Sequence, residues 1–237
     1  MKARALHTWD VNTAEAREIQ RRLASEVVRL SPLDSDPKLV AGVDLSPPDQ
    51  DGRARGAAVV VRLPDMGIVE VRTAEATPKM PYIPGLLSFR ESPPILAALE
   101  KLTTIPDFVL VDGHGLAHPR RFGIACHIGL LLEIPTVGCA KNILRGRYEG
   151  LVAEQGAWAP LIDKDEVIGA AVRVKTGVSP IFVSIGHMVD LETAVRWVLA
   201  CRDRIRLPKP IALAHNAAAG KLPEMAPGSQ EQLELLT

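Results

Sequence analysis

Residues 108–121 read Phe108-Val109-Leu110-Val111-Asp112-Gly113-His114-Gly115-Leu116-Ala117-His118-Pro119-Arg120-Arg121. The apolar, β-prone start predicts a short buried strand, and the glycines, histidines and basic pair after it predict a polar loop. Catalytic groups in open α/β sheets gather beyond the carboxyl ends of strands. Asp112 lies at such an end and is therefore a candidate catalytic residue. The alternative is that Asp112 and Gly113 only form the turn that ends the strand.

Two more carboxylates follow apolar runs. Asp44 ends the run 39–43, and Glu91 follows the strand-like residues 86–90. If these segments lie beside the Asp112 strand, three carboxylates converge. Two carboxylates about 4 Å apart repel by roughly 4 kcal/mol at an effective dielectric constant near 20, so the cluster needs protons or a cation. Carboxylate oxygens select Mg²⁺ or Mn²⁺ over zinc, and Mg²⁺ takes a phosphate oxygen from its substrate, which predicts metal-assisted phosphodiester hydrolysis.

The composition indicates one globular domain without a charge bias. Of the 237 residues 47% are hydrophobic, and the 19 prolines and 18 glycines are scattered between periodic segments, which predicts many turns and no low-complexity region. Lysine plus arginine equals aspartate plus glutamate at 28 each, so any basic surface for nucleic acid must be local. Five basic residues after strand ends could face phosphate, or could be solvated surface charges: Arg120, Arg121, Lys141, Arg145 and Arg147.

The cysteines and the apolar runs indicate in which cellular compartment the protein is expected. Cys126, Cys139 and Cys201 are too few and too unevenly spaced for a disulfide framework or a zinc knuckle. The first ten residues lack an apolar signal core, and no apolar run approaches membrane-spanning length. We therefore expect a soluble, cytoplasmic, monomeric protein with no membrane partner.

The hydrophobic periodicity predicts a mixed sheet covered by helices. A capping box at Asn12 and Glu15 opens a helix that the apolar spacing continues to Ser31. Strands are expected at 39–44, 56–61, 68–73, 108–111, 135–140, 167–176 and 181–185, and further helices at 120–133, at 191–201 and after a cap at Ser92, where Pro93 and Pro94 would open the helix. The domain would span residues 1–220, with His215 in a weakly patterned segment and a disordered tail at 221–237.

A proline-rich loop at residues 77–85 has three prolines around Tyr82. Proline fixes φ and removes a main-chain donor, so this loop cannot join a ladder or a helix and holds Tyr82 and Ile83 stiffly. The pattern indicates a rigid aromatic wedge. The alternative is an ordinary connection whose Tyr82 packs on the core.

The loop from Asp112 to Arg120 strongly resembles that of the endonuclease V family of deoxyinosine-directed repair nucleases. The resemblance covers most of the chain, since the segments 40–44, 81–84, 89–91, 139–148, 183–184 and 186–187 match in the same order. Asn142 and Ile185 stand where Ser and often Pro would be expected, but neither position supplies the expected chemistry. The resemblance implies a ribonuclease-H-like α/β fold, in which a mixed five-stranded central sheet has helices on both faces and small additions.

The same resemblance implies a Mg²⁺-dependent endonuclease, with Mn²⁺ as a substitute, that nicks DNA at the second phosphodiester bond on the 3′ side of deoxyinosine. By position, Asp44, Glu91 and Asp112 would be the metal-binding catalytic carboxylates. His118 and Lys141 would assist at the scissile phosphate, and His215 would complete the site. Nine residues are expected to bind the substrate, at the flipped base, at the gap that the base leaves in the duplex or along the strand. They are Pro81, Tyr82, Ile83, Pro84, Gly85, Leu87, Arg90, Gly115 and Arg120.

Three other functions remain open at this point. A zinc hydrolase could use Asp112, His114 and His118, but histidines four apart suit zinc only on a helix, and the glycines and Pro119 argue against a helix. The chain could also be a non-catalytic binder of damaged or branched nucleic acid. Inosine-containing RNA is a third possibility, because a preference for the 2′-hydroxyl leaves no mark in the sequence. The sequence also leaves open whether one or two metal ions act.

Overall fold

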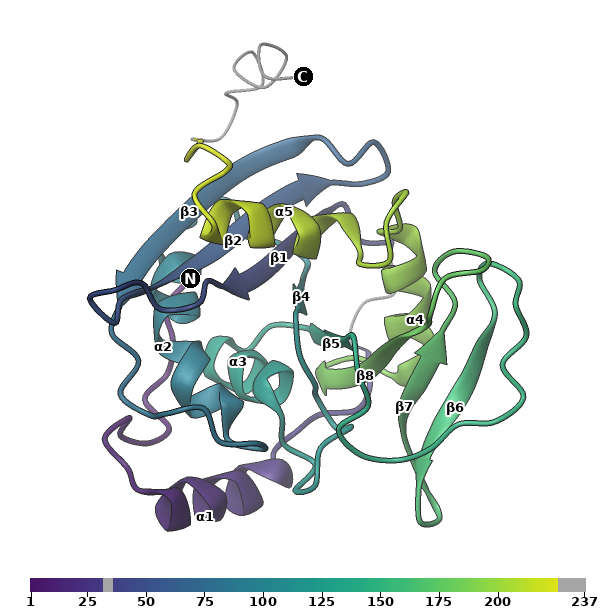
Figure 1. Ribbon diagram of the computed structural model, residues 1–237, viewed down its shortest axis with the longest axis horizontal. Helices are drawn as coiled ribbons and strands as arrows, with labels where there is room; N and C mark the ends of the chain where they lie inside the picture. The colour runs from purple at the N-terminus through teal and green to yellow at the C-terminus, as the bar shows by residue number, and fades with distance from the viewer. Residues whose placement is uncertain (32–35, 226–237) are drawn as a thin grey trace.

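Figure 1 shows the computed structural model of the protein, which describes residues 1–31 and 36–225. The strands form one sheet in the order β3-β2-β1-β4-β5-β8-β7-β6. They are β1 (Leu39–Leu45), β2 (Ala54–Arg62), β3 (Ile68–Ala76), β4 (Phe108–Val111), β5 (Thr136–Ala140), β6 (Trp158–Asp163), β7 (Glu166–Val172) and β8 (Ile181–His187). The helices are α1 (Thr13–Ala24), α2 (Leu87–Glu100), α3 (Ile124–Leu132), α4 (Leu191–Ala200) and α5 (Lys209–Ala218).

The sheet is mixed, as predicted. Strands β1, β4 and β5 are parallel neighbours, whereas β2 and β3 on one side and β8, β7 and β6 on the other pair antiparallel. The five strands β3-β2-β1-β4-β5 match the expected central sheet, and β8, β7 and β6 extend the same sheet beyond those five. Strands β7 and β8 were predicted from the sequence. The sequence missed β6, an edge strand in which Trp158 and Pro160 are exposed while Ala159 and Leu161 are buried, a position where proline is tolerated.

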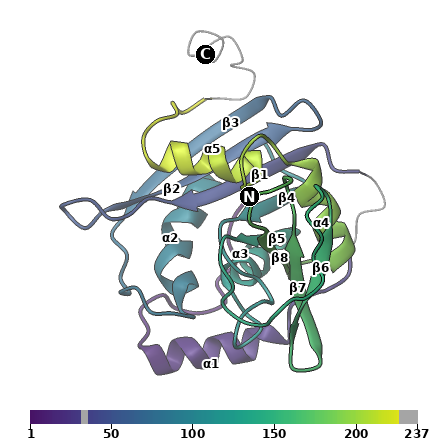
Figure 2. The same cartoon turned by 45° about the vertical axis from the view of Figure 1, so that its right-hand side comes forward.

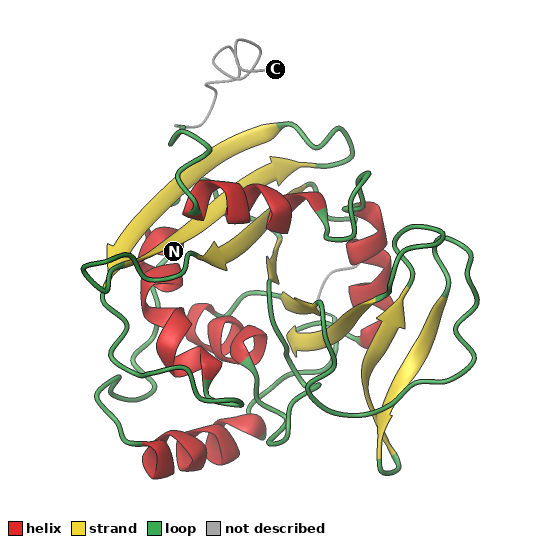
Figure 3. Ribbon diagram, in the orientation of Figure 1, coloured by secondary structure: helices red, strands yellow, loops and turns green. Residues whose placement is uncertain are grey.

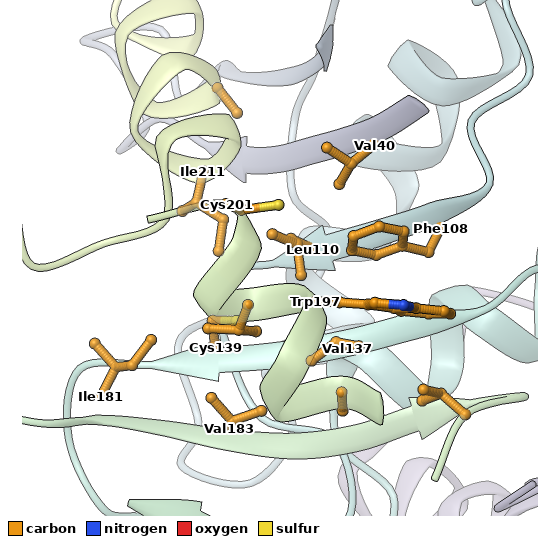
Figure 4. Close-up of a cluster of buried hydrophobic side chains, with 14 of the residues drawn as sticks. Val40, Phe108, Leu110, Val137, Cys139, Ile181, Val183, Trp197, Cys201 and Ile211 are labelled. Atoms are coloured by element: carbon orange, nitrogen blue, oxygen red, sulfur yellow. The ribbon is translucent and has the colours of Figure 1, made fainter. Parts of the chain in front are cut away.

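Helices cover both faces of the sheet, α4 and α5 on one and α2 and α3 on the other (Figures 2 and 3). The alternation along β4 divides its side chains between two cores, because successive residues point to opposite faces. Phe108 and Leu110 pack with Trp197 of α4 (Figure 4), and the Phe108 and Trp197 rings stack at a centroid distance of 4.4 Å. Val109 and Val111 pack against α2 and α3 instead. The central strands are therefore held rigidly from both sides.

Three predicted helix boundaries are wrong. Helix α3 begins at Ile124 and not at residue 120, and the other two differences have identifiable reasons. The capping box at Asn12 and Glu15 is present, but α1 ends at Ala24 and not at Ser31. Beyond it, the Val28 N–H donates to His187 Nδ1 and the Val28 carbonyl accepts from the Met188 N–H, so the chain pairs with the end of β8 instead of continuing the helix.

Helix α2 begins at Leu87, so neither a strand at 86–90 nor a cap at Ser92 exists. The Leu86 N–H bonds to the Ile83 carbonyl, and the Phe89 N–H bonds to the Leu86 carbonyl, which starts the first turn well before the prolines. Pro93 and Pro94 lie inside the helix and remove two of its main-chain hydrogen bonds. As a result, Glu91 is presented by a helix and not by a strand.

The domain also extends further than predicted. Met225 forms a β-bridge with Val71, and the Glu224 carboxylate accepts hydrogen bonds from the main-chain N–H and the hydroxyl of Thr73. The prediction of a disordered tail is therefore wrong for residues 221–225. The remaining residues of that predicted tail lie outside the described residues. Across the described part of the chain, no helix is long and apolar enough to cross a membrane.

Glu70 provides a stability prediction at the sheet edge. Its side chain is fully buried, accepts hydrogen bonds from the N–H groups of Thr103 and Thr104, and pairs with Arg72 at 2.9 Å. Burial alone would raise the pKa of Glu70, but these partners outweigh it and hold the pKa below its usual value. The ionised Glu70 carboxylate therefore stabilises the folded state. Its contribution is complete above the unfolded-state pKa and is lost as pH falls through the folded-state pKa.

We expect Glu70→Gln to lower the free energy of unfolding by about 2–4 kcal/mol at pH 7, because buried donors and Arg72 lose a charged acceptor. The difference from wild type should shrink as pH falls below about 4.5. Thermal melts across pH would check this. An exposed control, Glu154→Gln, should change little, and a Glu70→Gln melt that matches wild type at pH 7 would contradict the prediction.

Candidate active site

The parallel pairing of β1 and β4 places two of the predicted carboxylates side by side. Val43 is in register with Val111, and each is followed by an aspartate, so Asp44 and Asp112 leave neighbouring strands at the same edge of the sheet. Glu91 reaches the same place from the second turn of α2, a helix that packs against β1 and β2. The predicted convergence of three carboxylates therefore occurs, although one comes from an unexpected element.

The proximity of the carboxylates raises the pKa of two of them, Glu91 and Asp44. Burial, followed by the charges of Asp44 and Asp112, raises the pKa of Glu91 to about 8. Burial and the charge of Asp112 also raise the pKa of Asp44, although hydrogen bonds from His215 and Leu45 oppose that change. Among the described residues, nothing donates a hydrogen bond to the Glu91 carboxylate. A half-buried carboxylate that lacks a donor and faces two others is a suitable ligand for a hard cation.

Two basic side chains pair with the aspartates. Lys141 follows β5 and places Nζ 2.7 Å from Asp112 Oδ2, and His215 of α5 places Nδ1 2.8 Å from Asp44 Oδ2. With these pairs in place, no three His, Cys, Asp or Glu side chains of residues 1–31 and 36–225 are grouped closely enough to hold an ion as they stand. The donor set fits a divalent cation in chemistry, since it consists of carboxylate oxygens whose repulsion a cation would relieve.

His215 lies on a helix that the sequence analysis missed. Pro210 lies in the first turn of α5, an alanine-rich run follows, and Gly220 has φ of +73° just past the end. Proline at the start, good helix formers within and glycine at the end are signals that could have identified this helix.

Beside the carboxylates lies a cavity of about 240 Å³. It is smaller than the roughly 300–1,000 Å³ typical of sites for drug-sized ligands and suits a single base better than a larger ligand. His114 and Asn142 in its wall follow closely after Asp112 and Lys141 in sequence, which places the cavity next to the Asp112–Lys141 ion pair. Its lining consists of Gln20, Tyr82, Ile83, Pro84, Gly85, Leu87, Ser88, His114, His118, Gly123, Ile124, Asn142, Ile143 and Leu144.

Five predicted substrate-binding residues line this cavity, namely Tyr82, Ile83, Pro84, Gly85 and Leu87, and four do not, namely Pro81, Arg90, Gly115 and Arg120. The glycine at position 115 is required for packing, because a Cβ there would lie 1.9 Å from the Ile185 carbonyl oxygen. Arg90 donates to the Met80 carbonyl. Tyr82 is 68% exposed, so the alternative that it packs on the core is wrong.

The Gly85 carbonyl oxygen is the centre of a hydrogen-bond network in the cavity wall. It accepts from Gln20 Nε2 at 3.1 Å, from His118 Nε2 at 3.0 Å and from Arg120 Nη2 at 2.7 Å. Gln20 also accepts from Arg120 and donates to the Phe122 carbonyl. Three donors on one acceptor fix the end of the proline-rich loop to α1 and to the loop after β4. Sequence reasoning missed Gln20, which looks like any polar residue of an amphipathic helix.

His118 lies in this wall, and none of its hydrogen bonds reaches the carboxylates. Burial, then the charge of Arg120, lowers the pKa of His118 to about 4, so the ring is neutral at pH 7. Nε2 bonds to Gly85, and Nδ1 accepts from the Arg120 N–H. Because both ring nitrogens are engaged and residues 113–119 contain no helix, the zinc arrangement with Asp112 and His114 is not formed.

Besides Lys141, two residues of the predicted basic surface form ion pairs with acidic side chains. Arg121 pairs with Asp163 and Glu166 at the β6–β7 hairpin, and Arg145 pairs with Asp163. These contacts attach the hairpin to the loop after β4. The expectation that Arg121 and Arg145 face phosphate is therefore not supported by their surroundings.

The chain matches known proteins of one family over most of its length. A family model described as endonuclease V matches residues 21–216. Endonuclease V of Gloeobacter violaceus is 48% identical over 215 residues, which span 90% of this chain and 87% of that protein. The crystal structure of Streptomyces avermitilis endonuclease V aligns with a TM-score of 0.84 at 38% identity, over 93% of this chain and 97% of that one.

A further solved structure is Ciona intestinalis endonuclease V in complex with a 23mer DNA containing an inosine followed by a ribo-adenosine. It aligns with a TM-score of 0.77 at 29% identity, over 89% of this chain and 98% of that one. These neighbours share the ribonuclease-H-like fold, which confirms the predicted fold class.

Proposed function

Because this chain belongs to the endonuclease V family of nucleases, we propose that it is a Mg²⁺-dependent endonuclease acting on deoxyinosine in DNA. In this proposal it hydrolyses the second phosphodiester bond on the 3′ side of the lesion. The observation that supports it best is the convergence of Asp44, Glu91 and Asp112 beside a base-sized cavity. The DNA with inosine that the Ciona relative holds agrees with this substrate.

Asp44, Glu91 and Asp112 would hold the metal, because carboxylate oxygens are the ligands that Mg²⁺ prefers. When bound, such an ion polarises a phosphate oxygen and provides hydroxide at neutral pH. Lys141 Nζ, which lies 2.7 Å from Asp112, would offset negative charge on the phosphate as the bond breaks. His215 is 60% exposed at its side chain and bonds to Asp44 through Nδ1, so it would help to orient that carboxylate.

The cavity would receive the flipped base and exclude water around it. Hypoxanthine presents an N1–H donor and an O6 acceptor. The Gly85 carbonyl already accepts three hydrogen bonds, so its contribution would be to hold the wall in place, while other main-chain groups of the lining contact the base. The exposed ring of Tyr82 at the rim would fill the gap that the base leaves in the duplex.

The direct test uses an end-labelled duplex with one deoxyinosine and a matched duplex with adenine. We expect Mg²⁺-dependent nicking of the first duplex only, abolished by EDTA, with a 5′ fragment that ends one nucleotide beyond the lesion. An inosine-containing RNA of the same sequence tests the RNA alternative. Binding without any nicking would support the non-catalytic alternative and overturn the proposal.

Tyr82→Ala should weaken cleavage of deoxyinosine in duplex DNA more than in single-stranded DNA. A stacked aromatic ring returns roughly 1–3 kcal/mol, which matters most where flipping must break stacking and pairing. The measurement is kcat/KM on both substrates at one salt concentration. Tyr82→Phe keeps the ring and should behave like wild type. Equal losses on the two substrates would mean that the ring stacks on the substrate in general and that no duplex-opening wedge is needed.

Lys141→Ala should lower kcat by about 10²–10³, with a smaller effect on substrate binding, because its charge acts on the transition state. Lys141→Arg, which keeps the charge, should retain more of the rate. Single-turnover rates and binding constants separate the two effects. A loss of binding with unchanged kcat would make Lys141 a phosphate anchor only.

A further inference from the structure

We propose that the connection between α4 and α5, together with Lys175 of the β7–β8 loop, binds the backbone phosphates of the substrate strand on the 3′ side of the cut. This inference rests on the proposed function and extends it. The surface consists of Lys175, Arg204 and Arg206 and is called the basic turn below. None of its residues lines the cavity.

The basic turn has charges that no acid neutralises. Throughout the described ranges, no carboxylate lies within ion-pair distance of Lys175, Arg204 or Arg206, whereas cations such as Arg62, Arg121 and Arg145 are paired. The neighbouring Asp203 uses its carboxylate to accept the Arg204 N–H at 2.7 Å. Because the chain as a whole has no net charge, a group of unpaired cations is a local excess that suits a polyanion.

The basic turn is attached directly to the active centre. Arg206 Nη2 donates both to the carbonyl oxygen of Lys141, the residue that pairs with Asp112, and to that of Pro180. Lys175 Nζ donates to the Arg204 carbonyl at 3.1 Å, which joins the β7–β8 loop to the turn. Lys175 and Arg204 are exposed. The basic turn is therefore joined through Arg206 to the main chain of Lys141, and two exposed cations lie on it.

The position of the basic turn next to Lys141 indicates which side of the cut the bound phosphates come from. The cavity wall continues along the chain from Lys141 through Asn142, Ile143 and Leu144, while Arg206 binds the main chain of Lys141 itself. With the base in the cavity and the cut on its 3′ side, the strand passes from the cavity to the carboxylates and then beyond them. Nucleotides 3′ of the cut are the ones that can reach the basic turn.

The test removes the two exposed charges in the double variant Lys175→Gln/Arg204→Gln and leaves Arg206, which holds Lys141. Arg196→Gln is the matched control, because Arg196 is an exposed arginine of α4 without an ion pair in the described structure. Binding is measured in EDTA at several salt concentrations on the deoxyinosine duplex. Two further duplexes are shortened, one on the 3′ side to end at the cut bond and one on the 5′ side. Melting temperatures confirm that each variant is folded.

We expect the double variant to bind the full duplex about tenfold more weakly and to reduce the slope of log affinity against log salt by about 0.9 for each phosphate that is no longer neutralised. The defect should persist on the 5′-shortened duplex and disappear on the 3′-shortened one. A defect no larger than that of Arg196→Gln, or one that persists without the 3′ flank, overturns the inference. Failure of the wild-type protein to nick the full duplex would instead overturn the proposed function.

Discussion

Asp112→Asn is expected to lower the rate of nicking at deoxyinosine by about 10³ or more while leaving the melting temperature in EDTA unchanged or higher. The substitution keeps the shape of the side chain but removes the charge that would help to hold the metal. Several kcal/mol of transition-state stabilisation depend on such an ion, and each 1.36 kcal/mol corresponds to a tenfold change in rate. Stability should not fall, because like charges gather at this site.

The pairing of Asp112 with Lys141 does not alter this expectation. The lysine side chain is 43% exposed, so the ion pair contributes little in the absence of metal. Single-turnover rates in Mg²⁺ and melts in EDTA provide the two readings. Asp51→Asn, at an exposed turn, is the control. A variant that nicks at near-normal rate would remove Asp112 from the site.

Glu91→Gln should abolish cleavage and also change how stability depends on pH. The pKa of Glu91 in the folded protein is about 8, well above the usual value of a glutamate. Between these two values the folded state retains a proton that the unfolded state has lost. The metal-free wild-type protein should therefore lose stability as pH rises from about 4.5 to about 8, by up to roughly 1.4 kcal/mol for each pH unit.

Glutamine has no proton to lose, so the variant should not show this part of the decline. At pH 8.5 in EDTA we expect it to melt about 5 °C or more above wild type, and the difference should vanish near pH 4.5. Glu154→Gln, at an exposed position, serves as the control. Parallel melting curves across this pH range would show that Glu91 does not face the two aspartates as described. Added Mg²⁺ should reduce the difference, because a bound cation stabilises the ionised form of Glu91.

Comparing Asp112→Asn and Glu91→Gln with Glu70→Gln separates the carboxylates needed for function from the one needed for stability. Both remove a carboxylate that would hold the ion, and neither is expected to weaken the metal-free fold. The contrast is Glu70, a buried glutamate whose partners are main-chain N–H groups and an arginine. Its removal should destabilise the protein. A buried carboxylate thus stabilises or destabilises the fold according to whether donors or other carboxylates surround it.

The sequence by itself determined the features that depend on neighbouring residues. Apolar runs that each end at a charged residue identified β1, β4 and β5. The position of Asp112 at a strand end followed from the same local pattern. The capping box at Asn12 was readable because its hydrogen bonds join residues within one turn.

Only the tertiary structure decided which residues meet. Residues 86–90 are a short apolar run that suits a strand or a helix, and packing of α2 on the sheet selected the helix that presents Glu91. His215 bonds to Asp44 across 171 residues of sequence, and Gln20 bonds to Gly85 across 65. Whether a basic residue is free or paired likewise depends on distant acids, as Arg121 and Arg145 show. Periodicity and spacing describe single segments, whereas burial, pairing and pKa arise from contacts between segments.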